Sequence, residues 1–239
     1  MKTIPILMYH NIGTPPDEAN LRNLYVRTGA FGRQMLLLKL LGYKGLSMSA
    51  AMPYIRGEKS GRIVVITFDD GYLDTLEQAL PVLNTFGFSA TCYVVSGRIG
   101  ESNDWDAAAL NVRKQLMTAG QVKAWQAAGM EVGAHSRTHP HLPACTDAEL
   151  QAEIAGSKVD LETLTGAAVT QFCYPYGDLD ARVAEAVRNA GYSAATTTQR
   201  GRARPGDDAV LLRRILVSGS NMLHLFLLKL LTSYEDKRG

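Results

Sequence analysis

Short runs of apolar residues alternate along the whole chain with longer segments of helical periodicity. The apolar runs predict strands at residues 4–9, 63–68, 90–95, 130–134, 171–174, 193–196 and 211–217. The periodic segments predict helices at residues 31–41, 75–86, 118–128, 147–164, 180–190 and 221–231. Because strands and helices alternate from one end to the other, the pattern indicates an α/β fold in which crossover helices join parallel strands.

The length of the chain favours one large domain. With 239 residues, of which 46% are hydrophobic, residues 1–239 can bury a single core. The strand–helix units are fewer than the eight of the usual barrel and predict a somewhat smaller one, although periodicity does not show whether the sheet closes. In an open sheet or a barrel, functional residues gather at the carboxyl ends of the strands. The segment 99–117 is long for a connection and is expected to overhang that edge.

The charge of the chain is nearly balanced, with 25 basic and 23 acidic residues and a formal net charge of +2. Long runs of like charge are absent from the sequence, so nucleic acid is not expected as a partner. One cluster of basic residues is predicted to form a solvated loop and strand edge. It consists of Arg200, Arg202, Arg204, Arg213 and Arg214.

Cysteine spacing and hydropathy indicate the cellular compartment in which the protein is expected. Cys92, Cys145 and Cys173 lack the spacing of a disulfide framework or a zinc cage and are predicted to be small buried residues. Residues 1–10 predict a strand and not a signal peptide, and the sequence contains no stretch of about 18 apolar residues. We therefore expect a cytoplasmic or membrane-peripheral protein, with export open if a leader has been removed. The apolar segment 222–231 is favoured as a core helix over a membrane-contacting one.

Two adjacent aspartates follow the predicted strand at 63–68. Asp69 and Asp70 end the apolar run, and Gly71 comes directly after them. Neighbouring residues of a strand point to opposite faces, so such a pair can perform two tasks, one carboxylate binding a metal while the other moves a proton. The alternative is that both acids cap the helix predicted from residue 75.

Two histidines follow another predicted strand. His135 and His139 are four residues apart, and on a helical turn this spacing puts both imidazoles on one side, where they can hold one metal ion. With one aspartate the ligand set becomes two nitrogens and one oxygen, which leaves positions open for water and substrate, as is typical of a catalytic metal. The alternative is that both are loop histidines with ordinary hydrogen bonds.

Two other strand ends carry candidate residues. His10 ends the first predicted strand and is a candidate proton donor, although a lone histidine at a strand end is more often structural. After the strand at 171–174, Pro175 constrains a turn in which the Tyr176 amide could point at a developing oxyanion.

Together these segments resemble the polysaccharide deacetylase family, the NodB-homology or carbohydrate esterase 4 group. The segment 67–71, Thr-Phe-Asp-Asp-Gly, matches the first motif of that family, and the segment 135–139, His-Ser-Arg-Thr-His, matches the second. The resemblance extends from the first strand to beyond Gly177, which is most of the chain. It implies a distorted (β/α) barrel of NodB-homology type with about seven parallel strands.

The resemblance also implies roles for the matched residues. Asp69 becomes the general base, while Asp70, His135 and His139 become the ligands of a divalent metal, often zinc, with other divalent transition metals as alternatives. The implied reaction is hydrolysis of N-acetyl groups on an N-acetylglucosamine-containing glycan, with release of acetate.

Two parts of the family pattern are missing. The third motif is often Arg-x-Pro-Tyr, with the arginine steadying the base, but Cys173 stands at that place while Pro175 and Tyr176 remain. A late Leu-x-His motif, which supplies the general acid in many members, is also absent from the strand at 211–217. The chain instead resembles the branch that deacetylates poly-β-1,6-N-acetylglucosamine, in which an early Met-Tyr-His supplies the acid, and this implies His10.

The remaining expectations concern substrate contacts and rival functions. Trp105, Pro175 and Tyr176 are candidate contacts for sugar rings, although a loop tryptophan can equally pack on the core. The rival functions are an O-acetyl esterase acting on a polysaccharide and a glycan-binding protein of the same fold with little or no turnover.

Overall fold

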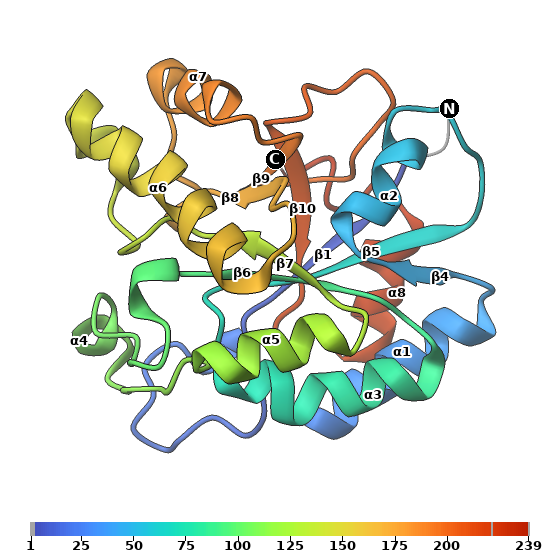
Figure 1. Ribbon diagram of the computed structural model, residues 1–239. Coiled ribbons are helices and arrows are strands. Elements are labelled where there is room, and N and C mark those ends of the chain that lie inside the picture. Colours follow the sequence, from blue (N-terminus) through green and yellow to red (C-terminus); the bar gives the residue numbers. More distant parts are fainter. Residues whose placement is uncertain (1–2, 221, 239) are drawn as a thin grey trace.

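A parallel sheet occupies the centre of the molecule, with helices around it (Figure 1). This computed structural model describes residues 3–220 and 222–238. The strands of the central sheet are β1 (Ile6–Tyr9), β4 (Lys44–Leu46), β5 (Ile63–Phe68), β6 (Thr91–Val94), β7 (Glu131–Ala134), β8 (Gln171–Cys173), β9 (Ala194–Arg200) and β10 (Leu212–Leu216). Their order is β1-β10-β9-β8-β7-β6-β5-β4, with every neighbouring pair parallel.

The sheet closes because β1 pairs with β5 as well as with β10. Tyr9 lies opposite Phe68 on one side of β1, and Leu7 lies opposite Ile215 on the other. Strands β1 and β5 to β10 therefore form a closed ring, and β4 pairs with the first half of β5 while β6 pairs with its second half. This arrangement confirms the predicted barrel of seven parallel strands and explains its distortion, since β5 shares one edge between two partners.

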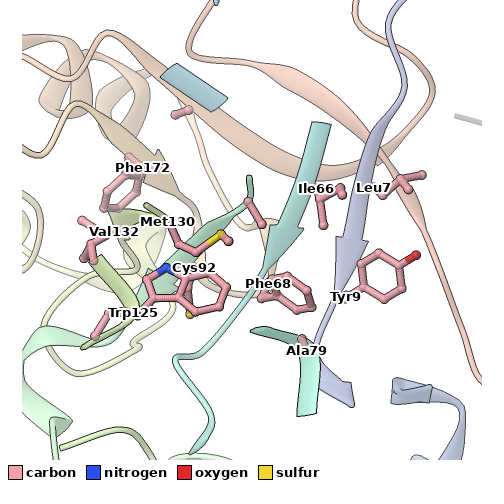
Figure 2. Close-up of a cluster of buried hydrophobic side chains, with 14 of the residues drawn as sticks. Leu7, Tyr9, Ile66, Phe68, Ala79, Cys92, Trp125, Met130, Val132 and Phe172 are labelled. Carbon is pink, nitrogen blue, oxygen red and sulfur yellow. The ribbon is translucent and has the colours of Figure 1, made fainter. Parts of the chain in front are cut away.

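Successive side chains of the barrel strands belong alternately to two apolar clusters. On β5, Val64, Ile66 and Phe68 belong to the larger cluster, which lies between the strands and the outer helices. Figure 2 shows Phe68 in this cluster between Tyr9 and Trp125, with ring centroids 5.5 and 6.0 Å away. The alternate positions of β5 join a smaller cluster together with the buried residues of α2 (Met48–Ile55). The period of two along β5 thus determines which side chains enter the barrel.

Most predicted helices are present. Besides α2, the helices are α1 (Thr28–Leu40), α3 (Leu80–Phe86), α4 (Ala107–Leu110), α5 (Ala119–Ala127), α6 (Asp147–Thr165), α7 (Ala181–Asn189) and α8 (Leu223–Leu231). Short helical turns are η1 (Arg22–Leu24), η2 (Thr75–Ala79), η3 (Ser96–Arg98), η4 (Leu142–Ala144) and η5 (Pro175–Gly177). Capping boxes at Thr118 and Thr146 explain why α5 and α6 begin where the pattern predicts.

Some elements differ from the prediction. The helix expected at 75–86 is divided into the π-helical turn η2 and α3, and a small sheet of β2 (Asn11–Ile12) and β3 (Tyr25–Val26) was not predicted. For the helix expected at 221–231, Asn221 lies outside the described residues, as do Met1 and Lys2 of the segment 1–10.

The C-terminal helix belongs to the core. Phe226 and Leu230 of α8 are buried in the larger cluster, whereas Leu228 and Leu231 are exposed. Within the described part of the chain, the helices lack the length and hydropathy of a membrane span.

Candidate active site

Strand β5 delivers Asp69 and Asp70 to one mouth of the barrel. Thr67 points into the barrel, where its hydroxyl donates to the Leu7 carbonyl, and Asp69 occupies the next inward position. Asp70 then adopts a left-handed conformation with φ of 74°, and Gly71 follows with φ of 78°. Non-glycine residues adopt this region only where surrounding contacts hold them there, so the fold fixes the sharp turn at Asp70.

Asp69 is held by a buried arginine from β10. Nη1 and Nη2 of Arg214 each donate to one carboxylate oxygen of Asp69 at 2.7 Å. Arg214 is fully buried, and its Nε donates to the Thr197 carbonyl at 2.8 Å. Burial alone would raise the pKa of the Asp69 carboxyl, but the Arg214 charge and hydrogen bonds outweigh this effect and hold the pKa below its usual value. Asp69 is therefore a fixed carboxylate.

The position of Arg214 corrects the prediction of a solvated basic cluster. Arg214 has 0% exposure, and two other members of the cluster are paired with the C-terminal segment, Arg200 with Glu235 and Arg202 with Asp236, both at 2.6 Å. The prediction failed because a count of basic residues ignores the strand period. Position 214 shares the inward face of β10 with position 212, which is the signal that could have identified this arginine.

Arg214 also occupies the place left by the missing motif arginine. Its Nη2 lies 3.2 Å from Sγ of Cys173, the residue that stands where many family members have arginine. Both side chains are buried inside the barrel, so a guanidinium reaches Asp69 from β10 instead of from β8.

Asp70 faces the two imidazoles of the second motif. Nε2 of His135 and Nε2 of His139 lie 3.4 and 3.5 Å from Asp70 Oδ1, and all three residues are buried. Nδ1 of His135 lies 2.7 Å from the Cys173 carbonyl, so Nδ1 carries a proton and Nε2 is the nitrogen that faces Asp70. Burial, together with the charge of His135, lowers the pKa of His139 to about 3, so this imidazole is neutral, the form that binds metals. The donor set fits a divalent transition metal.

The two histidines meet in an irregular loop, not on the predicted helical turn. Ser136 and His139 have φ of 60° and 63°, and the His139 N–H donates to Ser136 Oγ at 3.0 Å. A carboxylate from α6, that of Glu153, accepts hydrogen bonds from the backbone N–H groups of Arg137 and Thr138 at 2.8 Å each. This loop, and not helical periodicity, aligns the imidazoles.

The other predicted site residues surround this centre. Nε2 of His10 lies 3.9 Å from Asp69 Oδ2. Tyr176 has a left-handed φ of 60°, and its ring contacts that of His139 with centroids 4.5 Å apart. The Trp105 ring stacks against the His139 ring with centroids 4.9 Å apart, and Pro175 is buried. Contacts of these residues with a substrate stay predictions.

A cavity of about 210 Å³ lies at this end of the barrel, and Trp105 and Pro175 are not among its lining residues. Its lining includes Asp69, Asp70, His135, His139, His10, Tyr176, Asp106, Tyr72, Tyr174, Thr198, Leu21, Leu24, Ala109 and Leu110. The segment 99–117 contributes Asp106, Ala109 and Leu110, so it reaches this edge of the barrel. The Asn20 N–H donates to the Leu110 carbonyl at 2.9 Å, which ties this segment to the one after β2.

Comparisons with known proteins identify the family of this chain. A family model described as Polysaccharide deacetylase matches residues 56–195. YxkH of Bacillus subtilis (strain 168), which is named for the same family, is 30% identical over 217 residues, covering 90% of this chain and 71% of YxkH. The poly-beta-1,6-N-acetyl-D-glucosamine N-deacetylase of Staphylococcus aureus (strain N315) is 22% identical over 213 residues, covering 87% of this chain and 73% of that protein.

A solved structure has a similar fold over almost all of the chain. The deacetylase PplD of Streptococcus pyogenes, solved in complex with acetate, superposes with a TM-score of 0.85 at 25% identity and covers 97% of this chain and 99% of PplD. The family match at residues 56–195 contains both aspartates and both histidines of the site, whereas His10 and Arg214 lie outside it. On the family match and the likeness to YxkH, this chain belongs to the polysaccharide deacetylase family.

Proposed function

We propose that this chain is a metal-dependent N-deacetylase that hydrolyses the acetamide of an N-acetylglucosamine-containing glycan and releases acetate. The observation that carries the proposal is the different environment of two adjacent carboxylates. Asp69 is paired with Arg214, whereas Asp70 faces the Nε2 atoms of His135 and His139. Neighbouring acids with separate partners suit separate roles, one in proton transfer and one in metal binding.

The metal site of the proposal is the set of Asp70, His135 and His139. Two imidazole nitrogens and one carboxylate oxygen form the donor set of many catalytic zinc sites, so we propose zinc. When bound, such an ion polarises a carbonyl group and lowers the pKa of water. The three side chains are buried, the His135 ring is oriented by the contact of its Nδ1 with the Cys173 carbonyl of β8, and the His139 backbone is held by its N–H bond to Ser136 Oγ.

Asp69 is proposed to take the proton of the attacking water. Its pKa is low, so the side chain is an anionic acceptor at neutral pH. Arg214 occupies one hydrogen-bonding direction of each carboxylate oxygen and leaves other lone pairs facing the cavity that Asp69 lines.

His10 is proposed to protonate the departing amine, because an amide nitrogen leaves readily only after it receives a proton. Its position 3.9 Å from Asp69 puts it beside the base on the wall of the same cavity. The Tyr176 backbone N–H is proposed to stabilise the oxyanion. The left-handed conformation of Tyr176 sets the direction of this group.

The proposed substrate class is poly-β-1,6-N-acetylglucosamine or a related glycan. The staphylococcal relative is named for that activity, and His10 at the end of β1 matches the early histidine that the resemblance implies. Trp105 and Pro175 are proposed to contribute to the sugar site, in which Tyr176 lines the cavity.

Acetate release from a panel of acetylated glycans tests the proposal. We expect release from N-acetylglucosamine oligomers, loss of release after chelation, and recovery when Zn²⁺ is added. Release only from O-acetylated polysaccharides would instead identify an esterase. If no glycan is hydrolysed by protein with a stoichiometric metal content, the proposal is wrong.

The acid role of His10 has a separate test. His10→Ala should slow cleavage of the amide far more than cleavage of an activated acetate ester, whose leaving group needs no proton. Equal losses on both substrates would contradict this role.

A further inference from the structure

Asp106 places a third carboxylate in the catalytic cavity. It precedes α4 on the segment between β6 and α5 and lines the cavity together with Asp69 and Asp70. An aspartate at this position usually accepts hydrogen bonds from the first turn of its helix. Among the described residues of α4, the Asp106 side chain makes no such bond. Its Oδ1 instead accepts a hydrogen bond from the Tyr176 hydroxyl at 3.1 Å.

The carboxylate of Asp106 has capacity for a ligand. A carboxylate accepts about four hydrogen bonds; the Tyr176 hydroxyl uses one of them, and the Trp105 side chain contributes a second. Burial raises the pKa of the Asp106 carboxyl, because a partly buried carboxylate loses part of its hydration. Further hydrogen-bond donors from a bound molecule would therefore stabilise it.

The segment that carries Asp106 is anchored to the barrel. Lys114 forms an ion pair with Asp74 and donates to Asn11 Oδ1 of β2 at 2.7 Å. The Asn103 side chain accepts a hydrogen bond from the Lys114 backbone N–H at 2.6 Å. Asp106 is thus held in place before a ligand arrives, which reduces the entropic cost of binding.

The size and lining of the cavity suit a single sugar residue. Its volume of about 210 Å³ is below the range of roughly 300–1,000 Å³ that is usual for small-molecule sites, so it admits a small ligand such as one sugar residue. The apolar part of the lining consists of Leu21, Leu24, Ala109 and Leu110. A sugar ring presents both hydroxyl groups and C–H faces, so it matches a cavity in which a carboxylate accompanies apolar side chains.

We propose that Asp106 is a specificity-determining residue that accepts a hydrogen bond from a hydroxyl group of the same sugar residue that carries the acetamide. This inference rests on the proposed function and adds to it a requirement for that hydroxyl. A substrate in which the hydroxyl is missing or substituted leaves the carboxylate without a partner, and hydrogen bonds to charged groups of this kind contribute roughly tenfold to hundredfold to discrimination.

Deoxy sugars test the proposal. We would measure kcat/KM for acetate release from methyl N-acetylglucosaminide and from its 3-, 4- and 6-deoxy analogues, with the unaltered protein and with Asp106→Ala. For the unaltered protein, one analogue should be at least tenfold poorer than the parent sugar. With Asp106→Ala, the parent and that analogue should be hydrolysed equally. Discrimination that persists in Asp106→Ala would overturn the proposal.

Two further variants separate the carboxylate from its surroundings. Asp106→Asn keeps an oxygen for the Tyr176 hydroxyl but removes the charge, so it should lose most of the discrimination while it folds normally. The matched control is Asp104→Asn, because Asp104 lies on the same segment and pairs with Arg113 at 2.9 Å. This control should discriminate as the unaltered protein does; if it loses discrimination as fully as Asp106→Asn, the proposal is wrong.

A binding measurement distinguishes failure of this inference from failure of the proposed function. If the unaltered protein hydrolyses none of the sugars, the proposed function fails, and titration calorimetry with the parent and deoxy sugars then decides about Asp106. Weaker binding of the parent sugar by Asp106→Ala, with unchanged binding of one deoxy analogue, would support the inference. Equal affinities for both sugars, or no binding of the parent sugar, would contradict it.

Discussion

Carboxylates stand at both ends of the barrel, but their surroundings differ. At the amino end, the carboxylate of Glu131 accepts hydrogen bonds from the Ser49 N–H at 3.1 Å and from the Thr91 hydroxyl at 2.6 Å. Ser49 lies in the first turn of α2, so Glu131 satisfies a helix terminus. At the carboxyl end, Asp69 and Asp70 contact arginine and imidazole and line a cavity. The carboxylates at the two ends therefore differ in their partners, which are hydroxyl and backbone amide groups at the amino end and a guanidinium and imidazoles at the carboxyl end.

The two ends of the barrel also differ in backbone conformation, because non-glycine residues with positive φ lie at the carboxyl end. Asp70, Ser136, His139 and Tyr176 have positive φ values, and they follow β5, β7 and β8 at the carboxyl edge. The fifth such non-glycine residue in the described part of the chain, Asn111, lies on the segment that reaches the cavity. Non-glycine residues persist in this region only where surrounding contacts over-determine them. The unfavourable conformations are therefore concentrated at the candidate site.

The largest expected effect comes from the two aspartates at the carboxyl end. Asp69→Asn should lower kcat for acetate release by about 10²–10⁴-fold, because the proton acceptor is lost while the metal ligands remain. Asp70→Asn should lose bound metal as well as turnover. Kinetics with metal analysis of both variants measures this difference. Full turnover by Asp69→Asn, or equal metal loss in both variants, would remove the distinction between the two carboxylates.

A smaller effect is expected at the arginine inside the barrel. Arg214→Met leaves Asp69 buried without its partner, so we expect a loss of about 3–5 kcal/mol in the free energy of unfolding and a fall in turnover. Because Arg214 lies against Cys173, the double variant Cys173→Arg/Arg214→Met offers a guanidinium from β8. It should recover at least part of the turnover of Arg214→Met.

Denaturant unfolding and acetate-release assays of both variants measure these effects. Unchanged turnover in Arg214→Met would show that the pair does not support the base. If the double variant recovers stability without turnover, the guanidinium serves the fold alone.

The smallest effect on activity is expected at the amino end. Glu131→Gln should cost about 1–2 kcal/mol in the free energy of unfolding, because an amide replaces the charged acceptor at the terminus of α2. The value of kcat/KM should stay close to that of the unaltered protein, since Glu131 lies at the opposite end of the barrel from the cavity. Thermal unfolding together with steady-state kinetics checks both. If Glu131→Gln loses much of its turnover without a loss of stability, the carboxylate at the amino end is not purely structural and the proposed difference between the two ends is wrong.

Local patterns predicted most of the barrel but missed its short elements. The strands with continuous apolar runs and the helices with capping boxes are present near their predicted positions. Strand β4 has only three residues, and α2 contains Pro53, so neither has a clear periodic signal. Gly45 of β4 lies against Phe88, where a Cβ would approach the ring to 2.5 Å, so a long-range contact explains this glycine.

The sequence by itself determined the motif residues of the site, because Asp69, Asp70, His135 and His139 lie in short segments that follow apolar strands. The tertiary structure alone decided which residues accompany them. Arg214 is 145 positions from Asp69 and meets it only because β1 pairs with both β5 and β10 and so closes the sheet. Asp106 and Tyr176 are 70 positions apart and meet where two loops cross the same edge. Periodicity in the sequence predicts which face of a strand or helix a residue lies on. Contacts between residues that are far apart in the sequence depend instead on how the barrel closes.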